Sequence, residues 1–249
     1  MKKIHYLTIA AVALAGLAVP VTSLAADGGQ YTSNGAVTFE ANTDPTKPVD
    51  PTNPVDPIKP VDPTDPNGPK PGTNGPLSID YASSLDFGTQ KITSTDEVYK
   101  AKAQKYLDKA NAEKTGPNFV QVTDNRGLET GWNLQVKQNG QFKTAENQEL
   151  TGAAITFKNG NVVTNSSSEK PAGQATIKLS PDNALTNVMS AADGQGAGTY
   201  LLAWGTDAAT GAESIELAVP GSTTKYAKQY KTTFTWVLAD TPPATDPIQ

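Results

Sequence analysis

One stretch, GWNLQVK at residues 131–137, alternates apolar and polar side chains and indicates how the chain folds. Its tryptophan, leucine and valine point to one side of an extended backbone, and the polar residues between them point to the other. A second Trp-x-Leu tripeptide, Trp236-Val237-Leu238, lies within a similar alternating stretch at 230–238. Alternation over this length predicts a half-buried strand in each place, with each Trp and Leu on one face.

Short alternating stretches separated by Gly, Asn and Asp recur from residue 77 onward. Asn159-Gly160 lies between the stretches 153–157 and 162–164, which predicts a β-hairpin. Further strands are predicted at 77–81, 85–87, 119–123, 132–138, 175–179, 200–204, 215–219 and 230–238. The number and spacing of these strands predict an all-β fold, a β-sandwich or a barrel-like domain of many short strands.

The N-terminus resembles a secretory signal peptide over residues 1–25. Lys2 and Lys3 form a basic start, 7–19 is a run of small and apolar residues, and Ser23-Leu24-Ala25 offers small residues for cleavage. The run is shorter than the ~20 apolar residues of a spanning helix, and no other stretch qualifies. An uncleaved anchor is the alternative, but we expect a secreted chain with no membrane insertion after signal cleavage.

Charge and composition narrow the possible partners. Removing residues 1–25 takes away two lysines and no acidic residue, so the net charge falls from −5 to −7. This charge argues against nucleic acid and against anionic membrane surfaces as partners. The chain has no cysteine, so no disulfide stabilises the exported domain.

The single histidine, His5, lies in the predicted signal peptide. Without His or Cys, the mature chain cannot build a Ser-His-Asp or Cys-His nucleophile system and lacks the usual zinc ligands. We therefore expect no enzyme activity, no metal site and no cofactor. Carboxylate-pair hydrolysis stays formally open, but the candidate acids lie in turn-like contexts: Glu129, Asp193, Asp207 and Glu213.

A proline-rich tract at 44–76 separates a short alternating stretch, 36–41, from the main β body at 77–239. Between residues 45 and 69 every third residue is proline, which matches the three-residue turn of polyproline II. We expect an extended excursion that the fold does not need, and a strand at 36–41 that pairs back into the sheet. A spacer between modules and a docking motif for a partner are the alternatives.

The two Trp-x-Leu copies and their flanks resemble the WxL-domain proteins of Gram-positive bacterial surfaces. The resemblance covers essentially the whole mature chain, so we expect one WxL domain over 26–249. It is carried by these stretches: 36–42, Gly75-Pro76-Leu77-Ser78-Ile79-Asp80-Tyr81, Leu85-Asp86-Phe87-Gly88, Asn118 to Gly127, Gly131 to Leu134, and Tyr230 to Leu238.

The resemblance implies non-covalent attachment to the cell wall through peptidoglycan, within a multi-component surface assembly. A membrane-anchored WxL-interacting protein is the implied protein partner, and the chain is expected to be secreted and retained at the cell surface. The alternative function is a secreted adhesion or carbohydrate-binding module for host or dietary glycans.

The resemblance also implies that 98–106 is extended, although Thr95-Asp96-Glu97 could cap a helix over 96–113. We predict a strand at 98–103 and at most a short helix at 107–112.

The binding residues proposed from the sequence are the two motifs and their polar neighbours: Trp132, Leu134, Trp236, Leu238, Arg126 and Asn133. Two interpretations of the motifs stay open. Their apolar side chains either belong to the core, or form a joint patch that stacks on sugar rings or receives another protein. Arg126, the only arginine in the chain, either stabilises its turn or contacts the ligand.

Overall fold

The computed structural model describes residues 30–240. The chain divides into two compact units, one up to Thr38 and one from Phe39 onward, and the β body belongs to the second. The predicted signal peptide at 1–25 lies outside the described residues.

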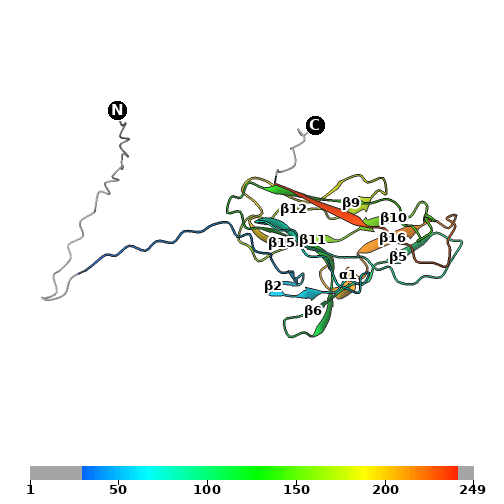
Figure 1. The fold of residues 1–249 in the computed structure, drawn as a ribbon, viewed down its shortest axis with the longest axis horizontal. Coiled ribbons are helices and arrows are strands. Elements are labelled where there is room, and N and C mark those ends of the chain that lie inside the picture. Colours follow the sequence, from blue (N-terminus) through cyan, green and yellow to red (C-terminus); the bar gives the residue numbers. More distant parts are fainter. Residues whose placement is uncertain (1–29, 241–249) are drawn as a thin grey trace, which may run out of the picture. The chain divides into compact units, whose positions relative to one another are not determined.

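The described part of the chain is built from short strands and one four-residue helix (Figure 1). The helix α1 spans Ala208–Gly211, and Asp207 caps it by accepting a hydrogen bond from the Thr210 backbone N–H. The first strands are β1 (Val49–Asp50), β2 (Asn53–Pro57), β3 (Lys59–Pro60), β4 (Leu77–Ala82), β5 (Glu97–Lys100), β6 (Gln104–Leu107), β7 (Glu113–Gly116) and β8 (Asn118–Asp124). The others are β9 (Trp132–Gln138), β10 (Ala154–Phe157), β11 (Gly160–Val163), β12 (Ala172–Gly173), β13 (Ile177–Leu179), β14 (Thr186–Ala191), β15 (Gly198–Trp204), β16 (Ile215–Val219) and β17 (Phe234–Ala239).

Three four-stranded sheets surround the main core. Their strand orders are β13-β10-β16-β5, β11-β15-β8-β4 and β12-β14-β9-β17. The largest side chains of this core are fully buried and come from all three sheets, including Trp132, Trp204, Tyr200 and Ile155. The all-β prediction is confirmed, because the inward faces of alternating strands supply nearly all of this core.

The proline-rich tract differs from the expected extended rod. β1 pairs with β2, and β3 pairs with β6. Ile58 is only 5% exposed and belongs to a second apolar cluster with Phe119 and Leu201, on the face of the β8–β15 pair opposite the main core. The expectation that the fold does not need the tract is wrong for residues 48–60, because their apolar side chains cover a sheet face that would otherwise be exposed.

A buried polar network joins the tract to the same sheet. The Gln121 side chain accepts a hydrogen bond from the Val49 backbone N–H (2.8 Å) and donates to the Asp80 carboxylate (2.8 Å). The Asp80 carboxylate also accepts from Thr123 and Ser78. Burial raises the pKa of Asp80 although these three hydrogen bonds act in the opposite direction.

The strand predicted at 36–41 is absent from the structure. Residues 36–41 have extended backbone without ladder partners, and Val37 is 75% exposed and Phe39 88% exposed. The backbone N–H of Asn42 donates to the Asn125 carbonyl at 3.3 Å, directly after this segment.

The hairpin predicted around Asn159-Gly160 is wrong, although β10 and β11 both exist. β10 pairs with β13 and β16, whereas β11 pairs with β15 in another sheet. Asn159 does adopt the left-handed conformation that the turn requires, with φ 57°, but the turn carries the chain between sheets. No strand forms at 85–87.

In the ambiguous stretch 96–113, the predicted strand corresponds to β5, which ends at Lys100. Residues 108–112 form a tight turn between β6 and β7 in place of the short helix that the sequence allowed. The Asp108 carboxylate accepts from the backbone N–H groups of Ala110 and Ala112, which closes this turn.

Candidate functional site

The two Trp-x-Leu strands are neighbours in one sheet. β17 pairs antiparallel with β9, with Leu238 opposite Leu134 and Trp236 opposite Val136 (Figure 1, where β17 is red). Directly paired residues of an antiparallel ladder point to the same face. The apolar side chains of both motifs therefore share the inner face of one sheet.

The first motif lies in the core. Trp132 and Leu134 are both 0% exposed. The Trp132 indole N–H donates to the Gly196 carbonyl at 3.0 Å, and its ring lies 6.4 Å from that of Tyr200. Neither side chain can contact a wall polymer in this conformation, because other side chains enclose both.

The second motif lies at the edge of the same sheet and is less enclosed. Trp236 and Leu238 are half-buried and pack against the main core from the outermost strand. The Trp236 ring centroid lies 6.2 Å from that of Trp204. The two copies of the motif therefore differ: the first is fully internal, and the second retains some contact with solvent.

Arg126 forms a bidentate ion pair with Asp124. Its Nε donates to Oδ1 at 2.9 Å and its Nη2 to Oδ2 at 2.8 Å, while Nη2 also donates to the Gly131 carbonyl. The two side chains are 13% and 1% exposed. A planar guanidinium that is paired in this way fixes the turn that leads into β9, and three of its five N–H groups are engaged in these contacts.

The outer face of the motif sheet is largely polar. Asn133, Gln135 and Lys137 alternate with the buried motif residues on β9, and their polar ladder partners are Ser190, Asn187 and Thr235. We call these six residues the amide face. On β17, Ala239 and Val237 pair with Asn133 and Gln135 and border this face. Asn187 is exposed and Gln135, Lys137, Ser190 and Thr235 are half-buried, whereas Asn133 is 9% exposed.

Hydrogen bonds between its side chains organise the amide face. Ser190 Oγ donates to Asn133 Oδ1 at 2.7 Å, and Gln135 Nε2 donates to Asn187 Oδ1 at 3.0 Å. Asn139 Nδ2, next to the face, donates to Thr235 Oγ1 at 2.9 Å. The six residues include no carboxylate. The sequence indicated the β9 half of this face, but it did not predict β14 and therefore missed Asn187 and Ser190.

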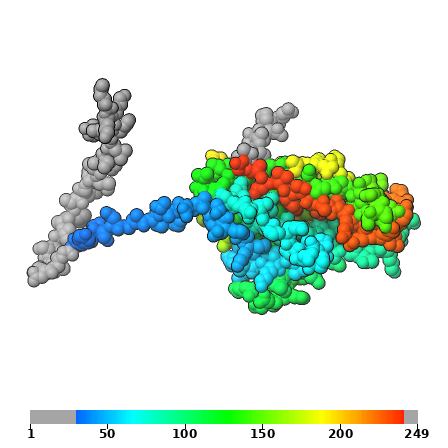
Figure 2. Space-filling view, in the orientation of Figure 1, coloured from blue at the N-terminus to red at the C-terminus, as the bar shows by residue number. Residues whose placement is uncertain are grey.

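A cleft of about 1610 Å³ lies between β4 and β17. The β17 residues Phe234 and Trp236 line one wall, and Ile79 and Ala82 of β4 line the other. Figure 2 shows β17 in red beside cyan segments on this side of the molecule. Six lysines and four aspartates also line the cleft, so it carries a formal charge of +2 in a chain whose net charge is −5.

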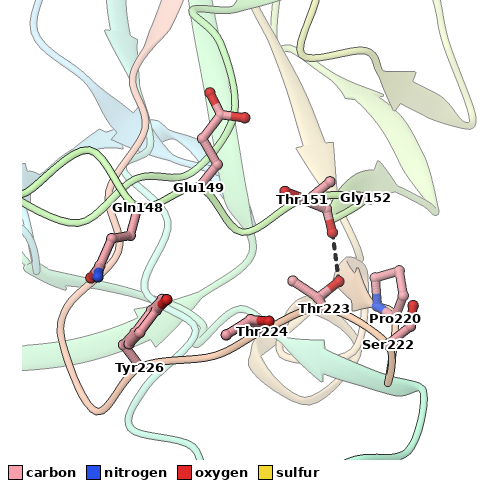
Figure 3. Close-up of a pocket in the computed structure, with 9 residues that line it drawn as sticks. All are labelled: Gln148, Glu149, Thr151, Gly152, Pro220, Ser222, Thr223, Thr224 and Tyr226. Atoms are coloured by element: carbon pink, nitrogen blue, oxygen red, sulfur yellow. Dashed lines mark hydrogen bonds between the residues drawn. The ribbon is translucent and has the colours of Figure 1, made fainter.

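A smaller hollow of about 500 Å³ lies between the loops 148–152 and 220–226 (Figure 3). Thr223 Oγ1 donates to the Thr151 carbonyl at 2.6 Å, which ties the two loops together. The carboxylate of Glu149, which lines the hollow, forms an ion pair with Lys143, with 3.0 Å between Oε1 and Nζ. The Thr223 hydrogen bond holds the loop that precedes β17 against residues 148–152, and Glu149 is the one acidic residue among those that line the hollow.

The acidic side chain of Glu216 is engaged in structural ion pairs. Glu216 lies between Lys100 and Lys158, with an oxygen 2.6 Å from each ammonium nitrogen. The hydrogen bonds from Lys100 and then Lys158 lower the pKa of Glu216. Over residues 30–240, no group of three or more His, Cys, Asp or Glu side chains is placed to hold a metal ion.

This arrangement of small antiparallel sheets, with a polar outer face and an open cleft beside the last strand, defines an all-β domain with two candidate binding surfaces. Residues 26–242 match the family model described as WxL domain, surface cell wall-binding, and the chain belongs to this family. The match supports attachment at the cell wall and surface. No curated protein and no solved structure matches the chain. Within the described residues, no helix is long and apolar enough to cross a membrane.

Proposed function

We propose that the protein attaches non-covalently to the bacterial cell wall by binding peptidoglycan through the amide face. The observation that carries this proposal is the orientation of the first motif strand. Its Trp132 and Leu134 are buried, so the side chains that the strand offers to a ligand are Gln135 and Lys137.

The chemistry of the amide face suits a glycan with N-acetyl groups and hydroxyls. Amide and hydroxyl side chains both donate and accept hydrogen bonds, and the ladder fixes them at strand spacing on a pleated surface. Gln135 and Asn187 hold each other in place, which lowers the entropy lost when a ligand is bound. The absence of carboxylates among the six residues avoids repulsion from the acidic stem peptides of the wall.

We further propose that the protein is not an enzyme and works within a multi-component assembly. The mature chain has no His and no Cys, so binding is the simplest role. A membrane-anchored WxL-interacting protein is the protein partner that family membership suggests. In this arrangement the domain connects the wall to other surface proteins, and no cofactor is needed.

The proposal is tested by co-sedimentation of the full mature chain with purified peptidoglycan, before and after removal of teichoic acids. We expect binding to both preparations, because the amide face recognises the glycan or its peptide. A variant with Gln135→Ala and Asn187→Ala should bind about tenfold more weakly, since each lost hydrogen bond contributes ~0.5–1.5 kcal/mol.

The matched control carries Ser222→Ala and Thr224→Ala, two polar truncations in the smaller hollow. It should bind like the wild type. Equal binding by both variants would reject the amide face, and loss of wild-type binding when teichoic acids are removed would reject peptidoglycan as the ligand.

A further inference from the structure

The last strand, β17, leaves an open sheet edge. It is the end strand of its sheet and pairs only with β9. Among the described residues, the backbone groups of 234–239 have no hydrogen-bond partner outside that pairing. Its sequence, FTWVLA, contains no charge and no proline, which are the features that usually protect an edge strand from pairing with another chain.

The cleft lies beside this edge. Phe234 and Trp236 line it and are only half-buried, as are Ile79 and Phe87 from other segments. β4, across the cleft, does not offer a comparable edge, because its Ile79 carbonyl already accepts from the Thr73 backbone N–H at 2.8 Å. An incoming strand can therefore pair with β17 and place alternate side chains against the half-buried apolar residues.

The same chain carries an unused strand-like segment at 36–41, AVTFEA. Val37 and Phe39 fall on one side of an extended backbone and are 75% and 88% exposed. Both residues suit a strand and would stabilise it through burial. The family match begins at residue 26, so this segment belongs to the matched region.

Charge also favours this pairing. Residues 30–44 contain Glu40 and Asp44 and no basic residue. The cleft has the opposite excess, with Lys225, Lys228 and Lys231 in the segment that leads into β17. The segment and the cleft therefore carry opposite net charge, which favours their encounter, whereas the contact inside the cleft is apolar, because Glu40 alternates with Phe39 and points to the other side of the strand.

We propose that residues 36–41 of one copy add as a strand to the β17 edge of a second copy, with Val37 and Phe39 in the cleft. The donor and acceptor surfaces are different, so the contact is heterologous: in a pair, the acceptor copy still offers a free donor segment and the donor copy still offers a free edge. Repetition links copies of the protein into a linear assembly. The amide face lies on the outer side of the sheet, where only its Thr235 also lines the cleft, so Gln135 and Asn187 stay available.

The test is sedimentation velocity of the full mature chain over a concentration series, without wall material. The wild type should form species larger than the monomer as its concentration rises. Val37→Asp with Phe39→Asp should remain monomeric with an unchanged unfolding midpoint, because both side chains are exposed. The matched control, Thr32→Asp with Ser33→Asp, adds the same charge at exposed polar positions and should associate like the wild type.

Two further measurements locate the contact. A fluorescently labelled Val37→Asp, Phe39→Asp chain should sediment faster when unlabelled wild type is added, because its β17 edge still accepts a strand. Amide hydrogen exchange of residues 234–239 should become slower as the wild-type concentration rises. It should not change with concentration when the Val37→Asp, Phe39→Asp variant is measured by itself.

A wild type that stays monomeric throughout the concentration series overturns the proposal. The β17 edge would then pair with the segment of its own copy or with a different protein. Association that persists in the Val37→Asp, Phe39→Asp variant also overturns it. Association without slower exchange in β17 would place the contact elsewhere and reject the cleft as the acceptor.

Discussion

Replacing Trp132 by alanine tests whether the first motif acts through the core. The side chain is 0% exposed, and it packs near Tyr200 within the main core. Truncation of a buried aromatic residue costs ~3–5 kcal/mol through lost burial and the remaining cavity. The Gly196 carbonyl also loses its indole donor, which adds a penalty of ~1–3 kcal/mol if that carbonyl stays dry.

This loss is large compared with the ~5–15 kcal/mol that stabilises a typical domain. Urea unfolding followed by far-ultraviolet circular dichroism measures it, as a lower midpoint at constant slope. Trp236→Ala should cost less, because that residue is half-buried on the outermost strand and water can reach part of the space. Trp132→Phe should fall between wild type and Trp132→Ala.

Peptidoglycan binding by the folded fraction of Trp132→Ala should equal that of the wild type. The core role would be refuted if the variant unfolds at the wild-type urea concentration while it loses wall binding. That result would mean that the indole reaches the ligand.

Three further changes test other parts of the structure. Trp204→Phe should destabilise the protein less than Trp132→Phe, because the Trp204 indole N–H is buried without a hydrogen-bond partner among residues 30–240 and its removal leaves no acceptor unsatisfied. Equal losses of stability in urea unfolding would contradict this. Ile58→Ala should cost ~2–5 kcal/mol, since the side chain is buried under the proline-rich tract; an unchanged unfolding midpoint would show that the tract does not pack on the sheet. Glu216→Gln should lower the free energy of unfolding by about 1 kcal/mol at pH 7, because Lys100 and Lys158 keep the pKa of Glu216 below its ordinary value. The ion pairs stabilise the protein fully at a pH above that ordinary value, and this stabilisation disappears as the pH falls through the lowered pKa. A loss of stability that persists in acid would rule out the ion pairs as its source.

Strand alternation predicted β9, whose apolar side chains are buried while Gln135 and Lys137 are half-buried, and it predicted β17, although all six residues of that strand are half-buried. The same local signal could not predict partners. Asn159 gives the correct turn, yet β10 and β11 diverge into different sheets, since their partners β16 and β15 lie far along the chain. Pairing of this kind depends on long-range packing, which a period-two pattern does not encode.

The proline-rich tract shows a second limit of sequence patterns. Polyproline II and edge-strand geometries have similar backbone angles, so a proline at every third residue is compatible with both. Burial of the Ile58 side chain in the cluster with Phe119 favours the strand geometry over the extended polyproline II rod. For the site, the sequence separated the two faces of β9, but only the packing showed that Trp132 is internal and that Asn187 completes the outer face.

The most direct test measures two quantities, the affinity for purified peptidoglycan and the free energy of unfolding, for one variant of the amide face and one variant of the first motif. Gln135→Ala with Asn187→Ala should lower wall affinity about tenfold and leave the free energy of unfolding nearly unchanged. Trp132→Phe should do the reverse, with lower stability and wild-type affinity for the folded protein. If the tryptophan variant loses affinity while the amide variant keeps it, the motif binds the wall through its apolar face and the account is wrong.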